Sequence, residues 1–62
     1  MMKKYIDSEG TIVEAFQTEG PITINTINGE VTGSVGDWVV YMPSGTVILP
    51  NSTFNVSFTE VI

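Results

Sequence analysis

Residues 22–33 read Ile-Thr-Ile-Asn-Thr-Ile-Asn-Gly-Glu-Val-Thr-Gly, and this stretch decides the fold class. Apolar and polar side chains alternate on both sides of the Asn-Gly pair, which is typical of half-buried strands. Asn28-Gly29 is the strongest short-range hairpin signal, because a type I′ turn needs positive φ at both of its central positions. We therefore predict a β-hairpin with strands at residues 22–27 and 30–35.

The two-residue turn also predicts how the two strands pair. With Asn28-Gly29 as the loop, Ile27 faces Glu30, and the pairing continues outward until Ile22 faces Val35. Directly paired residues share a face of the hairpin, so all apolar residues except Ile27 separate from the polar ones, and this supports the register over a one-residue slip. The predicted apolar face consists of Ile22, Ile24, Thr26, Val31, Gly33 and Val35.

Further strands are expected on both sides of the hairpin, because β-branched and aromatic residues dominate the segments between turns. Gly at the third position suits a type II turn in residues 34–37, and Met-Pro-Ser-Gly at residues 42–45 forms a second tight turn. The predicted strands lie at residues 11–17, 38–42, 46–49 and 54–62.

The last of these segments carries much of the expected core. Phe54, Val56 and Phe58 alternate with polar residues, so they are predicted to point the same way and lay an apolar face on the core. Phe16 and Trp38 are the other large side chains that the core is expected to enclose. A single 3₁₀ turn at residues 50–53 is the only helical element expected.

Short strands joined by tight turns predict one all-β domain over residues 1–62. We expect an antiparallel meander of about five to six strands that closes into a small barrel or roll. The chain has no Cys and no His, so neither disulfides nor a structural zinc site stabilise it. Homo-oligomerisation is therefore expected to contribute to the buried core, and exposed strand edges favour it.

The charge of the chain is unevenly distributed. Lys3 and Lys4 are the only basic residues, and seven acidic residues give residues 5–62 a charge of −7 within a net charge of −5. Nucleic-acid binding needs several Lys or Arg contacts with phosphates, so we expect no direct contact with DNA or RNA. No apolar run approaches the roughly 20 residues that span a bilayer, so no membrane association is expected. The acidity has two alternative interpretations, which are solubility alone and electrostatic complementarity to a basic surface on a partner protein.

The side-chain chemistry argues against an enzyme. Without His or Cys the chain lacks the commonest general base, the thiolate nucleophile and most transition-metal ligands, and we expect no cofactor. A pair of carboxylates among Glu14, Glu30, Asp37 and Glu60 would need a cleft that a barrel this small does not provide. Asp-Ser-Glu-Gly at residues 7–10 resembles the start of a calcium loop but lacks its remaining ligands, so we predict an acidic β-turn.

Two aromatic residues in one predicted strand are candidates for contact with a partner protein. Trp38 is either an interface anchor or the principal core residue, with Asp37 capping the preceding turn, and the scarcity of large side chains favours the core. Tyr41 and Met42 lie on opposite faces of the same strand, so one of them is expected to face outward. The full candidate set is Glu30, Asp37, Trp38, Tyr41 and Glu60.

Several short motifs follow one another along most of the chain. Val-Glu-Ala-Phe-Gln at residues 13–17 follows a Lys-Lys-Tyr start, and Val-Gly-Asp-Trp-Val-Val occupies residues 35–40. The remaining matching positions are residues 28–31, Gly45, Pro50, Phe54 and residues 58–61. In this pattern the chain resembles a group of small phage and prophage proteins. The resemblance implies a phage or prophage origin and action in the cytoplasm of a bacterial host, and it carries no activity for individual residues.

Together these observations predict a binding protein. Our first hypothesis is a non-enzymatic accessory protein that binds a host or phage protein, for instance by placing its acidic surface in the basic groove of a defence or nucleic-acid-handling enzyme. The first alternative is a structural, virion-associated component that assembles as a homo-oligomer. The second alternative is an oligomer that sequesters a small ligand at its interface, although the absence of Arg disfavours phosphorylated ligands.

Overall fold

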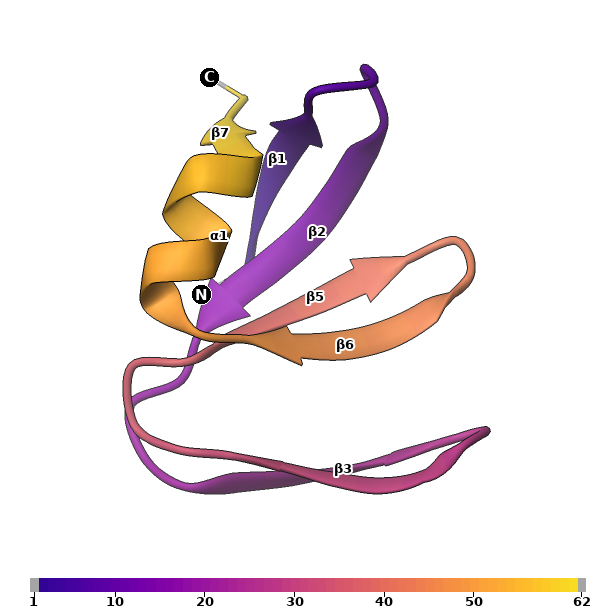
Figure 1. Cartoon of the computed structure of the whole chain (residues 1–62), viewed down its shortest axis with the longest axis vertical. Coiled ribbons are helices and arrows are strands. Elements are labelled where there is room, and N and C mark those ends of the chain that lie inside the picture. The colour runs from indigo at the N-terminus through magenta and orange to yellow at the C-terminus, as the bar shows by residue number, and fades with distance from the viewer. Residues whose placement is uncertain (1, 62) are drawn as a thin grey trace.

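The computed structural model describes residues 2–61, which form seven strands and one short helix (Figure 1). The predominance of β-structure confirms the predicted class. The elements are β1 (Lys3–Asp7), β2 (Ile12–Gln17), β3 (Ile22–Thr26), β4 (Gly29–Gly33), β5 (Trp38–Met42), β6 (Gly45–Leu49), α1 (Asn51–Ser57) and β7 (Phe58–Glu60). No helix within these residues is long and apolar enough to cross a membrane.

The strands form two sheets, and they do not close into the predicted barrel. Five antiparallel strands make one sheet in the order β6-β5-β2-β1-β7, and β3 and β4 make a separate hairpin. The hairpin leaves the sheet after β2, and the chain returns to it at β5, so the predicted continuous meander is interrupted. Figure 1 shows the hairpin beyond β6, while α1 and β7 lie at the other end of the molecule.

The hairpin forms where it was predicted, but its register and turn differ. Thr26 pairs with Gly29 and Ile22 with Gly33, so the loop consists of Ile27 and Asn28. Within residues 2–61 only glycines have positive φ, and Gly29 has φ of 111°, which rules out the type I′ turn. Because the pairing differs from the prediction by two residues, the predicted faces persist.

The hydroxyl group of Thr26 stabilises the observed turn, and the shift in register removes Val35 from the predicted apolar face. Thr26 Oγ1 donates to Gly29 O at 2.7 Å and accepts from Asn28 N–H at 3.1 Å. These bonds stabilise a loop in which neither Ile27 nor Asn28 has positive φ, and Gly29, directly after the loop, adopts the positive φ instead. Val35 finds no partner in β3 and is 67% exposed, so its predicted place on the apolar face is wrong.

The two other predicted turns are confirmed. Asp37 N–H donates to Ser34 O at 3.0 Å, and Gly36 has φ of 90°, as the third position of a type II turn requires. The Asp37 carboxylate caps this turn by accepting from Ser34 N–H at 2.9 Å. At residues 42–45, Met42 pairs with Gly45 and closes the β5–β6 hairpin.

The predicted strand at residues 54–62 is wrong over its first half. Residues up to Ser57 belong to α1, only Phe58–Glu60 forms a strand, and Ile62 lies outside the described residues. In the helix Phe54 is 2% exposed and Val56 is 86% exposed, so the two residues do not share a face. Phe54 and Phe58 are four residues apart, a spacing that brings their rings together at 5.0 Å.

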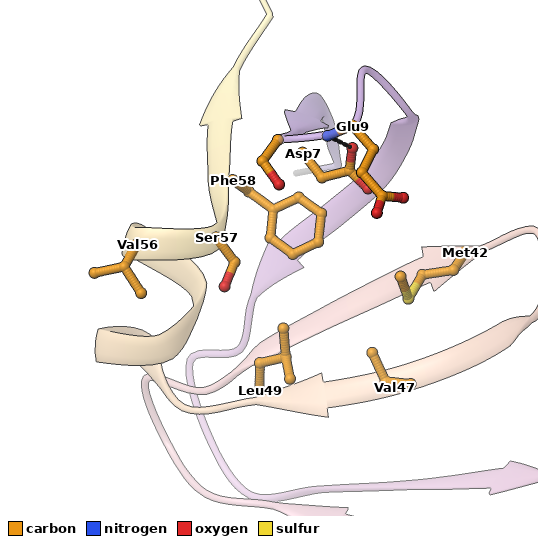
Figure 2. Close-up of a pocket in the computed structure, with 9 residues that line it drawn as sticks. Asp7, Glu9, Met42, Val47, Leu49, Val56, Ser57 and Phe58 are labelled. Atoms are coloured by element: carbon orange, nitrogen blue, oxygen red, sulfur yellow. Dashed lines mark hydrogen bonds between the residues drawn. The ribbon is translucent and has the colours of Figure 1, made fainter.

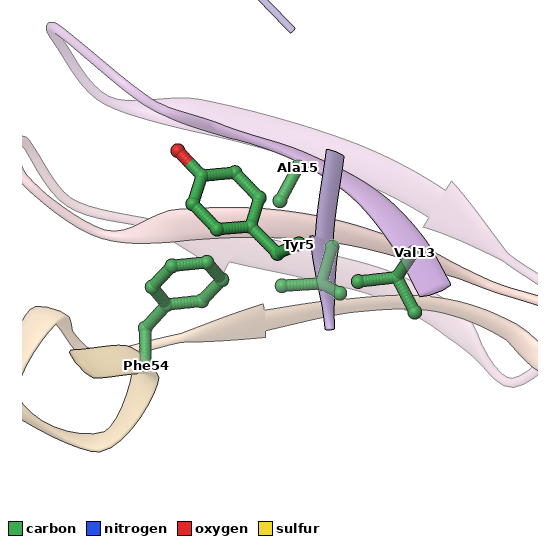
Figure 3. Close-up of a cluster of buried hydrophobic side chains, with 5 residues drawn as sticks. Tyr5, Val13, Ala15 and Phe54 are labelled. Carbon is green, nitrogen blue, oxygen red and sulfur yellow. The ribbon is translucent and has the colours of Figure 1, made fainter. Parts of the chain in front are cut away.

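One face of the five-stranded sheet is covered by α1, and we call it the helix face. Its buried cluster contains Tyr5, Val13, Ala15, Val40 and Phe54, with Trp38, Met42, Leu49 and Phe58 packed around it. The Phe54 ring stacks in parallel on the Trp38 indole at 3.9 Å, and the Tyr5 ring meets both of them edge-on. Figure 3 shows the Phe54 ring directed from the helix toward Tyr5 and Ala15. This cluster holds three of the four predicted aromatic core residues, whereas Phe16 does not belong to it.

The opposite face of the sheet is covered in part by the hairpin. Val39 is completely buried without belonging to the helix-face cluster, and its cross-strand partner Ile48 shares its face. Ile48 Cγ2 lies 3.0 Å from the position that a Cβ on Gly33 would occupy. The hairpin thus approaches the sheet through a residue that has no side chain. Phe16 lies on this opposite face, where its ring stacks with Tyr41 at 6.3 Å.

Candidate functional site

An open groove of about 600 Å³ lies on the helix face beside the aromatic cluster (Figure 2). Three parts of the chain form it: the β1–β2 turn, the β5–β6 hairpin and the C-terminal end of α1. Apolar residues line its floor, and polar residues line its rim. The apolar lining consists of Met42, Val47, Leu49, Val56 and Phe58, and the polar lining consists of Asp7, Ser8, Glu9 and Ser57.

Strand register places the apolar floor of the groove. Met42 and Val47 extend from β5 and β6 on the helix face, because residues two apart along a strand share a face and Val40 pairs with Val47. Leu49 continues the same row toward the helix. The Val47 side chain is 36% exposed, so part of this floor is apolar surface open to solvent, whereas Val56 lies at the helix rim with its side chain directed away from the sheet (Figure 2). Apolar surface with a polar rim is typical of binding sites.

The acidic rim is a structured turn, as predicted. Asp7 Oδ1 accepts from Glu9 N–H and from Thr11 N–H, both at 2.9 Å, and Gly10 has φ of 86°. The Asp7 carboxylate is therefore held at the edge of the groove by its own backbone. The Glu9 side chain is exposed next to it, and Figure 2 shows both carboxylates above Met42 and Phe58. Two negative charges thus border an apolar surface.

No basic residue lines this groove. Lys3 pairs with Glu60 at 3.5 Å, which is the only ion pair within residues 2–61, and both side chains are about half exposed. Since the chain has no basic residue beyond Lys4, nothing nearby neutralises the carboxylates of Asp7 and Glu9. The groove therefore presents a negative field to any partner that approaches it.

The third wall of the groove depends on how α1 is fixed to the sheet. Asn51 Oδ1, in the first turn of the helix, accepts from Trp38 Nε1 at 2.9 Å, from Asn55 Nδ2 at 3.2 Å and from Gln17 Nε2 at 3.3 Å. Gln17 Nε2 also donates to Gly36 O at 3.0 Å. One amide oxygen thus joins the helix to two strands, and the Trp38–Phe54 stack lies next to it. The helix end that carries Val56 is positioned by this arrangement.

The five predicted contact residues do not come together in one site. Trp38 is half-buried in the aromatic cluster, in agreement with the favoured core interpretation. Asp37 caps its turn, Glu30 is exposed on β4 in the separate hairpin, and Glu60 is exposed on β7 at a sheet edge. Tyr41 is the outward-facing member of its pair with Met42, and it lies on the face opposite the groove.

The residues that do form the groove were predicted for other roles. Asp7 and Glu9 were predicted as an acidic turn, and Val56 was expected in the core. The turn motif was correctly located, but its position beside α1 depends on a helix that the alternating pattern did not indicate. Thr18 was not singled out at all, although it is buried and its backbone bonds to Asp37 O and Gly36 N–H join two connections.

The structure provides no metal site and leaves no buried polar side-chain atom unpaired within residues 2–61. No three Asp or Glu side chains in that part of the chain come close enough to hold a metal ion. Comparison of the chain with models of protein families, with curated protein sequences and with solved structures finds no significant match.

Proposed function

We propose that this chain is a non-catalytic binding protein that engages a basic, partly apolar segment of a partner protein in the groove beside α1. The observation that carries the proposal is the combination of an exposed apolar floor with the Asp7 and Glu9 carboxylates and no basic lining residue. Apolar contact supplies affinity, and complementary charge supplies orientation and rate of association. A Lys or Arg next to an aliphatic residue has the chemistry that fits this groove.

Together with the resemblance to phage and prophage proteins, this function suits an accessory protein acting in the cytoplasm of a bacterial host. The whole-chain charge supports the same direction, because seven acidic residues against two lysines favour encounter with a basic surface. Proteins that bind nucleic acid carry such basic surfaces. The proposed partner is therefore a basic host or phage protein, and the proposed mode of action is to occupy its surface.

The test uses one charged substitution inside the groove and one outside it. Val47→Arg places a cation and a long side chain on the groove floor, whereas Ile27→Arg makes the same change on the hairpin, where the side chain is 94% exposed. Val47 lies on the edge strand β6 and is 36% exposed, so both variants should fold. We expect a bacterial protein retained on the immobilised wild-type chain to be lost with Val47→Arg and kept with Ile27→Arg.

A defined probe then tests the chemistry. A short peptide with Leu flanked by lysines should compete for the groove, and the same peptide with glutamates in place of lysines should not. Glu9→Gln is expected to weaken peptide binding about three- to tenfold at low salt, and Glu19→Gln, a change outside the groove, should leave it unchanged. Peptide binding that is unchanged in both Glu9→Gln and Val47→Arg would show that the groove is not the site.

A further inference from the structure

A second surface lies on the opposite face of the sheet, in the part that the hairpin does not cover. Strand register places seven residues there, from β5, β2, β1 and the C-terminal segment that follows α1, and we call them the outer patch. Ile12 is 53% exposed, and Tyr41 and Val61 are each 39% exposed. The outer patch consists of Lys4, Ile6, Ile12, Glu14, Tyr41, Thr59 and Val61.

The outer patch has an unusual order of side chains across the strands. Lys4 pairs with Glu14, Glu14 pairs with Tyr41 on its other side, and Val61 N–H donates to Lys4 O at 2.9 Å. The row therefore runs Tyr41, Glu14, Lys4, Val61, with an apolar residue at each end and opposite charges in the middle. Beside this row, Ile6 pairs directly with Ile12.

We propose that the outer patch binds a second copy of this chain, forming a two-fold symmetric dimer. A two-fold axis that runs between β1 and β2, parallel to them, exchanges the positions of Lys4 and Glu14. Each Lys4 then lies over the Glu14 of the other copy, and each Ile6 lies over the other copy's Ile12. The interface is self-complementary, as a two-fold contact requires.

Charge is the reason that the occupant is a second copy. The chain carries a net charge of −5, so most approaches between two copies bring like charges together. The outer patch has one Lys and one Glu and is neutral. Lys3 already pairs with Glu60, whereas Lys4 has no ion-pair partner within residues 2–61. The dimer supplies that partner, because stacked sheets lie about 10 Å apart, within the combined reach of Lys and Glu side chains.

The size of the outer patch limits the interface. The molecule measures 28 × 23 × 19 Å and the hairpin covers part of this face, so the outer patch offers less than the roughly 600 Å² of the largest whole face. A standard stable interface uses about 800 Å² per partner, and smaller ones belong to transient complexes. We therefore expect a reversible dimer with a dissociation constant in the micromolar range.

Charge reversal at the two central positions tests the geometry. Sedimentation equilibrium from about 1 to about 300 µM should show the wild-type chain passing from monomer to dimer. Lys4→Glu and Glu14→Lys should each raise the dissociation constant roughly tenfold or more, because two attractive pairs become repulsive. The double variant Lys4→Glu/Glu14→Lys restores both pairs and should return the constant to within about threefold of the wild type.

Matched controls separate this contact from the overall charge. Lys3→Glu changes the net charge as Lys4→Glu does, and Glu30→Lys changes it as Glu14→Lys does, but both positions lie outside the outer patch. Neither control should alter dimerisation beyond about threefold. A wild-type chain that stays monomeric at the highest concentration overturns the proposal. Single reversals without effect, or a double variant that remains monomeric, overturn it as well.

An apolar substitution provides a second test. Ile12→Ser should weaken the dimer, whereas Ile27→Ser on the hairpin should not, and the exposure of both side chains keeps the fold intact. Equal dimerisation of the two variants contradicts the proposed contact. The groove lies on the other face of the sheet, so Val47→Arg should leave the dimer unchanged. A failure of the dimer is thereby distinguished from a failure of the proposed protein binding.

Discussion

Helix α1 and the β3–β4 hairpin each cover one face of the same five-stranded sheet, but they attach by different means. The helix has seven residues and buries Phe54 among the aromatic rings of Trp38 and Tyr5. The hairpin is longer, and its only buried residue is Gly33, which lies against Ile48. A large side chain, Phe54, anchors the helix to the sheet, whereas the hairpin approaches the sheet closely at a glycine, Gly33.

The helix and the hairpin therefore derive their stability from different interactions. A helix of seven residues is unstable in isolation, since helices shorter than about 12 residues are marginal in water. Its existence depends on the sheet beneath it. The hairpin carries its own turn, cross-strand pairs and alternating faces, so its conformation is specified locally. Changes to the helix contact are therefore expected to destabilise the whole domain, and changes to the hairpin turn are expected to act locally.

The largest effect is expected at Phe54. Phe54→Ala removes the ring that contacts Trp38, Tyr5 and Phe58, and it should lower the free energy of unfolding by about 3–5 kcal/mol. A domain of this length has a total stability of roughly 3–9 kcal/mol, so the variant should be largely unfolded by near-UV circular dichroism. Val56→Ala is the control in the same helix, and it should change stability by less than about 0.5 kcal/mol. Folding of Phe54→Ala with nearly unchanged stability would show that the helix does not hold the core.

A smaller loss is expected where the hairpin meets the sheet. In Gly33→Ala the new Cβ would lie 3.0 Å from Ile48 Cγ2 and 3.2 Å from Ile22 Cγ2. Such overpacking should cost about 1–3 kcal/mol in urea denaturation, because the methyl groups of Ile48 and Ile22 must be displaced. Gly20→Ala is the matched control, since a Cβ there meets nothing within 4 Å. Equal stability of the two variants would mean that the hairpin is not seated on Ile48.

A local effect is expected at the hairpin turn. Gly29 has φ of 111°, which is costly for any residue with a Cβ, so Gly29→Ala should destabilise the turn by about 1–2 kcal/mol. Hydrogen exchange should speed up at the amides of β3 and β4 and change little at those of β1 and β2. Uniform acceleration over the whole domain would indicate that the hairpin and the sheet unfold as one unit.

The same contrast explains which elements the sequence predicted. The hairpin, the Gly36 turn and the Met42–Gly45 turn all depend on neighbouring residues, and their positions were predicted correctly. The predicted register of the hairpin is wrong because the Thr26 hydroxyl stabilises a different loop, which the pattern of apolar residues does not indicate. The helix was not predicted because the spacing of Phe54 and Phe58 fits both an alternating strand and a helical turn. Only packing against the sheet favours one conformation over the other.

The candidate groove was beyond prediction for a related reason. The turn at Asp7 and the strand with Met42 were each located, but they are far apart in sequence, and the strand order β6-β5-β2-β1-β7 brings them to one face. That order depends on the hairpin leaving the sheet between β2 and β5. The outward position of Tyr41, by contrast, followed from strand alternation alone, because it required no knowledge of neighbouring strands.

The smallest effect is expected at the amide that fixes the helix. Asn51 Oδ1 accepts from Trp38, Gln17 and Asn55, so Asn51→Ala should cost about 1 kcal/mol in thermal unfolding, an amount limited by the exposure of these bonds. Asn51→Asp keeps an acceptor oxygen in place and should retain most of the stability. Loss of stability in both variants to the same extent would show that the amide oxygen is not the point of attachment. Stability kept in Asn51→Asp but lost in Asn51→Ala would show that a short helix needs a polar anchor as well as a buried ring.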